Sequence, residues 1–256
     1  MVYITKFKHL TKNFFKIIYY KVFKKTNYTL SKIRKNEILI HHHLGLGDTI
    51  ICNGMINFLS NHFEKIVLPT KKNIINQIRF LYSENKKIEV IEISDEKEIY
   101  NSKYEVLRVG FEKNFGKFNI SFYNQLDLPY EYSFKYFNIP ENKLKTDQLF
   151  RHLLEVYSIE KEFQLVHNTS SYGKVDLKLN DNLKVVYVEK NTDIFQNIFL
   201  YTELIKFAKE IHCIDSSFLH LVERVNSSAD LYFHPIKKNG QVSEKLYLLK
   251  DWNIIN

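Results

Sequence analysis

Apolar residues follow two spacings along this chain, one typical of buried strands and one typical of helices. From residue 37 onward, short apolar runs alternate with longer segments in which apolar residues recur every three or four positions. The runs predict strands at 37–43, 65–68, 88–93, 104–109, 162–167, 183–188, 210–214 and 229–233, and the segments predict helices at 49–61, 72–81, 194–209 and 218–225. Strands that alternate with helices favour an α/β fold with a largely parallel, doubly wound sheet.

The alternation is interrupted once, by an aromatic segment at 115–160 that has helical character and no strand periodicity. We expect this segment to cover one face of a first sheet and to lead to a second series of strands and helices. The sequence therefore predicts two Rossmann-like half-domains that face a cleft. Their predicted bounds are 36–160, which includes the helical extension, and 161–256, after a leader at 1–35.

The leader has the pattern of a basic amphipathic helix. Apolar residues between 5 and 25 recur at helical spacing, at Phe7, Leu10, Phe14, Ile17, Ile18 and Val22. Residues 1–35 hold nine Lys, one Arg and no acidic residue, so they carry +10 of the net charge of +8, and the remainder carries −2. Such a helix either lies on an anionic membrane surface or packs its apolar face on the body of the protein. A nucleic-acid-binding arm is disfavoured because the body is slightly acidic.

Composition excludes several classes of protein. With 45% hydrophobic residues the chain can bury a substantial core. Cys52 and Cys213 fit neither a disulfide framework nor a zinc motif, which indicates a reducing compartment. Neither a run of 18 apolar residues nor a secretory signal is present. We therefore expect a cytoplasmic protein, which the leader would place at the inner face of the membrane.

The first candidate site is the glycine turn that follows strand 37–43. Gly45 and Gly47 permit a sharp turn and a close approach by a ligand, and Asp48 stands at the predicted helix N-cap. A cap alone would stabilise the helix by about 1 kcal/mol. Alternatively, a carboxylate at the carboxyl end of a parallel strand lies in the crevice where ligands bind. The turn lacks the G-x-G-x-x-G spacing of a dinucleotide-binding loop, which disfavours a dehydrogenase.

Three consecutive histidines precede this turn. In a strand, His41 and His43 point to one face and His42 to the other, so the three cannot converge on one metal ion. We expect structural or cleft-lining roles for them, and no metal cofactor.

The second candidate site follows the strand at 162–167. Thr169, Ser170 and Ser171 offer hydroxyl groups, and Lys174 offers a positive charge, which together suit a pyrophosphate. An ordinary polar loop would have the same composition, so the segment alone does not decide between the two interpretations.

The third candidate site follows the strand at 210–214. Asp215, Ser216 and Ser217 lead directly into a predicted helix, where free N–H groups and the helix dipole favour a nucleotide diphosphate. We expect the Asp215 carboxylate to accept hydrogen bonds from the amides that follow it. His220 lies one turn further along, where it either reaches a phosphate or is a satisfied core histidine.

In this order, the three segments resemble the heptosyltransferase-like GT-B group of glycosyltransferases, similar to glycosyltransferase family 9. That group has a Gly-Asp pair after its first strand, a Thr/Ser-rich loop with a Lys at the start of its second domain, and a late Asp-Ser/Thr-Gly/Ser series followed by His. The matches are Gly47-Asp48, Thr169-Ser170 with Lys174, and Asp215-Ser216-Ser217 with His220. The resemblance spans residues 37–235, and the third segment is its most specific part.

The resemblance implies an inverting, metal-independent transfer of a sugar from a nucleotide-diphosphate donor to a glycan or glycolipid acceptor. It makes Asp48 the general base on the acceptor hydroxyl. It gives the first half the acceptor and the second half the nucleotide sugar, held by Gly45, Gly47, Thr169, Ser170, Ser171, Lys174, Asp215, Ser216, Ser217 and His220. Ser217 stands where the family has Gly, and the chain is short for two full Rossmann domains. The alternative is therefore a non-catalytic nucleotide- or sugar-binding relative of the same fold.

Overall fold

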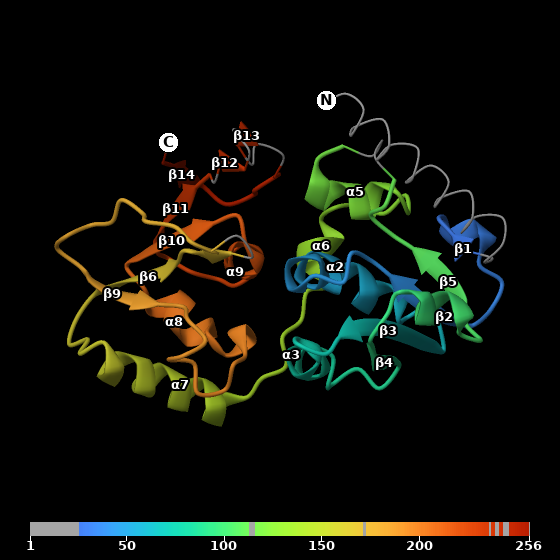
Figure 1. Ribbon diagram of the computed structural model, residues 1–256, viewed down its shortest axis with the longest axis horizontal. Coiled ribbons are helices and arrows are strands. Elements are labelled where there is room, and N and C mark those ends of the chain that lie inside the picture. The colour runs from blue at the N-terminus through green and yellow to red at the C-terminus, as the bar shows by residue number, and fades with distance from the viewer. Residues whose placement is uncertain are drawn as a thin grey trace.

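A computed structural model of the protein describes residues 26–112, 116–170, 173–235, 237–238, 241–242 and 246–255. These residues form a mixed α/β fold with two five-stranded parallel sheets, which lie in two halves side by side (Figure 1). All eight predicted strands are confirmed, with bounds that differ by up to three residues. The amphipathic helix predicted at 5–25 lies outside the described residues.

The first sheet has the strand order β1-β5-β2-β3-β4, and all its neighbouring strands are parallel. Its strands are β1 (Thr26–Asn27), β2 (Glu37–His41), β3 (Lys65–Lys71), β4 (Ile88–Ile93) and β5 (Glu105–Arg108). The crossovers contain α2 (Leu46–Leu59), α3 (Ile75–Leu81) and α4 (Lys97–Asn101). The middle of the central strand β2 is apolar because both of its faces are covered, and Ile38, Leu39 and Ile40 are fully buried.

The second sheet has the order β14-β11-β10-β6-β9 and is also parallel. Its strands are β6 (Phe163–His167), β9 (Lys184–Tyr187), β10 (Glu210–Ile214), β11 (Asp230–His234) and β14 (Trp252–Ile254). Its helical elements are η2 (Ile198–Leu200), α8 (Thr202–Phe207) and α9 (Ser217–Val222). Two short antiparallel pairs, β7 (Thr169–Ser170) with β8 (Gly173–Lys174) and β12 (Lys237–Lys238) with β13 (Gln241–Val242), stand outside the sheets. The edge strand β14 was not predicted.

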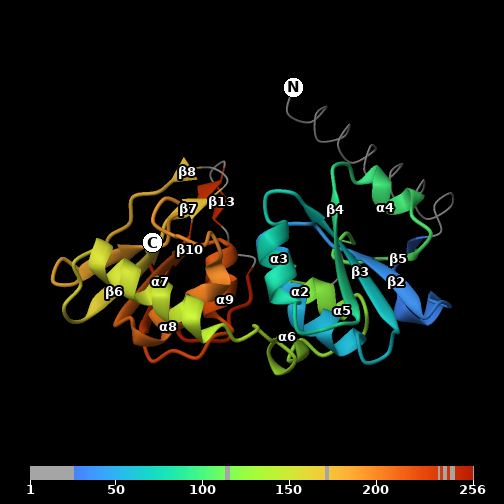
Figure 2. The ribbon, with the colours of Figure 1, turned by 90° about the horizontal axis from the view of Figure 1, so that it is seen from below.

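The aromatic segment between the two sheets is helical, as predicted. It contains α5 (Phe118–Asn124), α6 (Tyr132–Lys135) and α7 (Lys143–Val156). The first two contact α2, whereas α7 packs on α8 of the second half, where the rings of Phe150 and Phe207 lie 5.6 Å apart. Figure 2 shows α7 and α8 together on the second half, with α3 and α9 on the sides of the two halves that face each other.

The predicted helix at 194–209 is wrong in its first part, where the chain forms a turn and then the short elements η2 and α8. The buried Asp193 carboxylate accepts hydrogen bonds from the N–H groups of Phe195 (2.9 Å) and Asn197 (2.8 Å). The Asn197 side chain in turn accepts from the N–H of Phe199 (3.1 Å). These side chains take the amides that a continuous helix would need, which explains the shorter elements.

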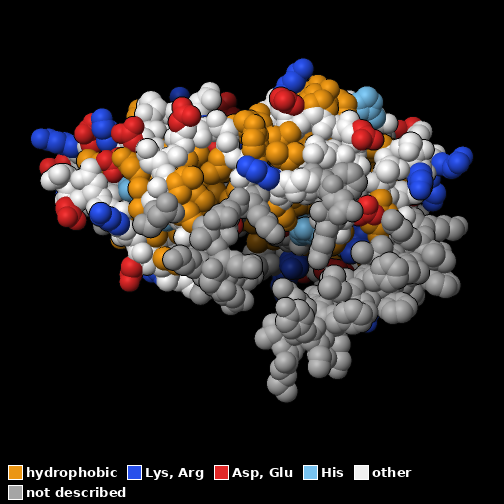
Figure 3. All heavy atoms as spheres, turned by 90° about the horizontal axis from the view of Figure 1, so that it is seen from above, with side chains coloured by type: hydrophobic (Ala, Val, Ile, Leu, Met, Phe, Trp, Pro, Cys, Tyr) orange, Lys and Arg blue, Asp and Glu red, His pale blue; other side chains and the backbone are white. Residues whose placement is uncertain are grey.

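Polar contacts join the two halves. Nε of Arg224, just after α9, donates to the carbonyl oxygen of Ser133 in α6 (3.2 Å). The C-terminal segment returns to α5, where the Asn119 side chain accepts from the N–H of Tyr247 (3.0 Å) and donates to its carbonyl oxygen (2.6 Å). Seen from above, the visible surface has hydrophobic side chains near the middle, with charged groups beside them and at both ends (Figure 3).

Replacing Gly54 by alanine should lower the free energy of unfolding by about 2–4 kcal/mol. A Cβ at this position in α2 would lie 2.1 Å from the carbonyl oxygen of Tyr132 and 3.0 Å from Cα of Ser133, both of which are backbone atoms of α6. Urea denaturation would measure the change. The exposed Asn61→Ala serves as the control, expected within about 0.5 kcal/mol of the wild type; an equally small change for Gly54→Ala would contradict this packing.

Candidate functional site

The candidate site lies where each sheet changes direction. In the first sheet the chain proceeds from β2 outward to β4 and then returns to place β5 on the other side of β2. In the second sheet it proceeds from β6 to β9 and then returns to place β10 on the other side of β6. Ligands of open α/β sheets bind beyond the carboxyl ends of the strands at such reversal points. The glycine turn after β2 and the polar segment after β6 occupy these two positions.

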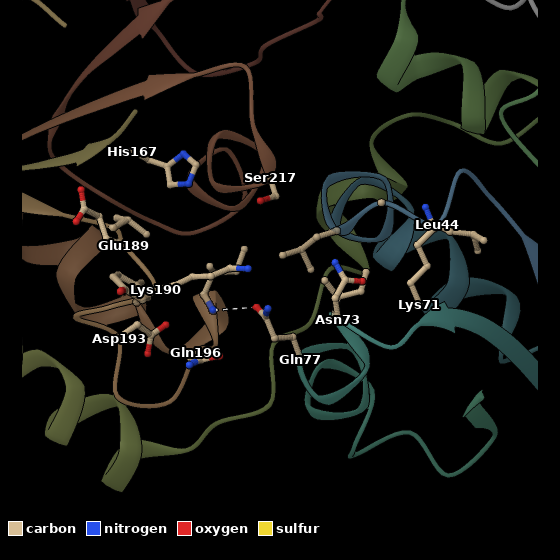
Figure 4. Close-up of a pocket in the computed structure, with 16 residues that line it drawn as sticks. Leu44, Lys71, Asn73, Gln77, His167, Glu189, Lys190, Asp193, Gln196 and Ser217 are labelled. Carbon is tan, nitrogen blue, oxygen red and sulfur yellow. Dashed lines mark hydrogen bonds between the residues drawn. The ribbon is translucent and has the colours of Figure 1, made fainter. Parts of the chain in front are cut away.

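Both turns open into one cleft between the halves. A cavity of about 830 Å³ is lined from the first half by residues 45–47 and from the second half by Thr169, Ser170, Glu189, Lys190 and residues 215–217. An adjoining cavity of about 410 Å³ shares part of this lining and extends toward Lys71 and Gln77 (Figure 4). Volumes of this order are typical of sites for small organic ligands.

Asp48 lies in the first turn of α2 and is not its N-cap, which corrects the prediction. The cap is Gly45, so the helix begins three residues earlier than predicted, at Leu46. Gly45 carries no side chain that could occupy the first amides, and a Cβ there would lie 2.3 Å from Oδ2 of Asp48. Glycine at this position therefore leaves room for the Asp48 carboxylate beside the turn.

Histidines surround the Asp48 carboxylate. Nδ1 of His43 lies 3.6 Å from Oδ1 of Asp48. Burial raises the pKa of Asp48, but the hydrogen bond with His43 and electrostatic interactions with the neighbouring histidines lower it by more, so the net shift is downward. The carboxylate is therefore ionised at neutral pH and can accept a proton.

The histidine run divides between two faces, as predicted. The rings of His41 and His43 both contact the ring of Phe111, and their centroids lie 4.9 and 4.6 Å from its centroid. The His42 side chain is buried on the other face. Nδ1 of His42 accepts from the N–H of Leu44 (3.1 Å), which has a φ of 61°. A bulky residue rarely adopts this left-handed conformation, and such strain is common at functional turns. Among the described residues, no group of three or more potential metal ligands is found.

The third predicted segment lies at the cleft, but its capping residue is Ser216. The Ser216 hydroxyl accepts from the N–H of Leu219 at 3.5 Å, at the start of α9. Burial raises the pKa of Asp215, and no hydrogen bond from the amides that follow reaches its carboxylate in the described part of the chain. The predicted capping role of Asp215 is therefore wrong. Ser217 lies against Gly47 of the other half, since a Cβ on Gly47 would be 3.5 Å from Cα of Ser217.

His220 is a buried core histidine beside the cleft, in the last turn of α9. It is 4% exposed, and its Nδ1 has no hydrogen-bond partner among the described residues. Burial and the nearby Arg224 lower its pKa to about 3, against a smaller upward effect of Asp48. Its Cδ2 lies 3.3 Å from where a Cβ on Gly47 would be. Glycine at position 47 thus allows α2 and α9 to approach closely, and a larger side chain there would press on the His220 ring.

The second predicted segment reaches the cleft only in part. Thr169 and Ser170 line the larger cavity, whereas Ser171 lies outside the described residues. Lys174 does not line either cavity: it is exposed, its Nζ lies 2.7 Å from Oε1 of Glu189, and it lies over the ring of Tyr187. The Lys174 charge, which was predicted to bind a phosphate, is thus paired with the Glu189 carboxylate.

Two lysines that the sequence analysis did not select supply positive charge at the cleft. Lys71 ends β3 and Lys190 follows β9, next to the reversal strands β2 and β6. Figure 4 shows them on opposite sides of the smaller cavity. Neither ammonium group has an ion-pair partner within the described ranges. Their signal in the sequence is a lysine at the carboxyl end of an apolar run, in LPTK and VEK.

The smaller cavity is also closed by a hydrogen bond across the cleft. Oε1 of Gln77 on α3 accepts from the N–H of Ile198 at the start of η2 (3.1 Å), which Figure 4 draws as a dashed line. Gln196, two residues earlier, has a φ of 49° and lines the same cavity. Because both partners lie at the cavity wall, this contact sets the distance between the halves at that end.

Comparison with protein-family models, with curated proteins and with solved structures finds no match to this chain.

Proposed function

We propose that the protein is a glycosyltransferase of GT-B-like arrangement that transfers a sugar from a nucleoside-diphosphate donor. The observation that carries the proposal is that the turns after both reversal strands line one cavity of about 830 Å³ between the halves. Shared lining by two α/β halves suits a reaction between two substrates, one held by each half. The resemblance of the three segments to the heptosyltransferase-like group supports the same reaction.

In this proposal, the donor diphosphate lies between the start of α2 and the second half. Gly45 caps this helix and Gly47 lies in its first turn, so no side chain at these two positions covers the first amides, and Thr169 and Ser170 add hydroxyl donors. Lys190 and Lys71 supply the positive charge that stabilises the departing diphosphate. The proposed transfer therefore uses side chains and amides where other transferases use a metal ion.

The acceptor in this proposal is a glycan or glycolipid hydroxyl, from which Asp48 removes the proton. The basic segment 5–25 would hold the enzyme at the cytoplasmic face of a membrane, where lipid-linked acceptors are present. None of the helices in the described ranges has the length and apolar character needed to cross a membrane. A vesicle-sedimentation assay with and without anionic lipid tests this placement on the full chain.

A thermal-shift panel of nucleoside diphosphates, each measured with and without EDTA, tests the proposed function. We expect one diphosphate to raise the midpoint, as mass action requires of a ligand that binds only the native state, and EDTA to leave the shift unchanged. If every diphosphate leaves the midpoint unchanged at millimolar concentration, the transferase assignment fails. Binding without transfer to any acceptor would instead favour the non-catalytic nucleotide-binding relative.

Replacing Lys190 by alanine should weaken binding of that diphosphate by about 10-fold or more, whereas Lys174→Ala should change it by less than about 3-fold. Lys190 lines both cavities without an ion-pair partner in the described chain, whereas Lys174 is paired with Glu189 outside them. Isothermal titration of both variants measures the difference. A larger loss of affinity for Lys174→Ala than for Lys190→Ala would indicate that the loop after β6 binds the phosphates.

A further inference from the structure

A second polar pocket lies at the opposite end of α2 from the cleft. Asn53, Asn57 and Asn61 recur every four residues, so they lie on one side of the helix and its C-terminal extension. Asparagine is a poor choice inside a helix because its side chain competes for backbone hydrogen bonds. A stripe of three therefore needs another reason to be there.

The asparagines form an ordered network that reaches the surface. Nδ2 of Asn57 donates to Oδ1 of Asn53 (3.2 Å) and to the carbonyl oxygen of Tyr136 (3.1 Å). Nδ2 of Asn85 donates to Oγ of Ser60 (2.9 Å). The Asn57 and Asn85 side chains are thus fixed by protein partners before any ligand arrives, which lowers the entropic cost of binding.

The network lines a pocket of about 510 Å³ that is separate from the cleft and shares no residue with it. Around it, groups that donate and groups that accept hydrogen bonds remain available. The Asn61 amide and the Tyr136 hydroxyl have no hydrogen-bond partner among the described residues, and Glu84 uses only one of its two oxygens, toward Nδ2 of Asn138 (3.3 Å). The rim thus offers both kinds of partner within one small area.

A buried amide beneath this pocket holds two of its lining residues in place. Asn53 is fully buried, and its Oδ1 accepts from Asn57 and from the N–H of Asn138 (2.9 Å), which both line the pocket. Its Nδ2 interacts with the hydroxyl of Tyr82, which is also fully buried. Asn53 therefore supports the pocket from below, and the groups that remain available to a ligand are those at the rim.

From these observations we infer that the pocket formed by Asn57, Asn61, Glu84, Asn85, Tyr136 and Asn138 binds a neutral carbohydrate. Each sugar hydroxyl both donates and accepts, which matches a rim of amides, a carboxylate and a phenol. Tyr136 adds an aromatic ring beside the polar groups, backed by the rings of Phe58 and Tyr132 at 5.2 and 4.9 Å. The site is independent of the proposed transfer reaction.

Saturation-transfer NMR on the full chain tests the inference, with glucose, galactose, N-acetylglucosamine and lactose as separate probes at millimolar concentration. We expect transfer to at least one sugar. The double variant Asn61→Ala/Glu84→Gln should weaken that sugar's affinity by about 10-fold or more, because it removes an amide and the charge of an acceptor. Asn182→Ala, at an exposed loop position, is the matched control and should bind as the wild type does.

Two further arms separate this site from the cleft and from an anion site. The sugar signal should persist in Lys190→Ala, whose change lies in the cleft, so failure of the proposed transferase function would leave this result intact. The inference is overturned if none of the four sugars receives saturation, or if the double variant binds as tightly as the control. Displacement of the sugar by inorganic phosphate would also overturn it, since Lys86 and Lys87 at the rim would then define an anion site.

Discussion

Asp48→Asn should lower kcat for sugar transfer by about 10²- to 10⁴-fold while donor affinity changes by less than about 3-fold. The carboxylate is largely buried near the cleft, its pKa is shifted downward, and it has His43 within 3.6 Å. Asparagine keeps the size of the side chain and removes its capacity to accept a proton. The chemical step is then lost while the residues proposed to hold the diphosphate are untouched.

Steady-state transfer assays and titration with the diphosphate, on the same protein samples, measure these two effects. Asp181→Asn, a change of the same kind in an exposed loop, is the control and should retain wild-type kcat. If Asp48→Asn keeps kcat but loses stability, the carboxylate serves only to hold the start of α2. Equal losses in kcat and donor affinity would place Asp48 in donor binding.

Acidification from pH 6.5 toward pH 4 should destabilise the protein steeply. Burial lowers the pKa of His42 and His167 to about 4, and burial together with Arg224 lowers that of His220 to about 3. In the unfolded chain these groups titrate near pH 6.5, so below that pH the unfolded state binds more protons than the folded state. Stability is therefore full above about pH 6.5 and falls as pH decreases, by up to about 1.4 kcal/mol per pH unit for each histidine.

Urea denaturation at several pH values measures this slope. Asp193 and Asp215 act in the opposite direction because burial raises their pKa, so single histidine variants isolate the effect. His220→Gln should reduce the slope of unfolding free energy against pH, between pH 6 and pH 4.5, by about 1.4 kcal/mol per pH unit, which is the contribution of one proton. The exposed His62→Gln should leave it unchanged. A wild-type stability that is flat over this range would mean that these histidines are not held neutral in the folded state.

Strands were predictable because a buried parallel strand reads as an apolar run whatever surrounds it, as in residues 38–40 and 66–68. Helix starts were less predictable: by local preference Asp48 is a better cap than glycine, yet Gly45 caps α2 and Asp48 lies in its first turn. The helix at 194–209 was overestimated because Asp193 forms its turn only once it is buried.

The candidate site could be predicted where it consists of consecutive residues and not where it depends on pairing between distant ones. The turns at 45–48 and 215–217 were found as motifs. The partner of Lys174, by contrast, is Glu189 on another strand, and sequence spacing does not reveal that this pairing removes the lysine from the cleft. Lys71 and Lys190 became candidates only when the strand order placed their two strands beside the reversal strands.

The return of the C-terminal segment to α5 also orders events during synthesis. The first sheet is complete in the chain by residue 108, but Asn119 on α5 also bonds to Tyr247, which is synthesised much later. Because N-terminal units fold first as they leave the ribosome, the first half is present early with this side of α5 still uncovered. The contact between α5 and Tyr247 therefore forms last, so a nascent chain halted before residue 246 would present a folded first half that lacks this contact.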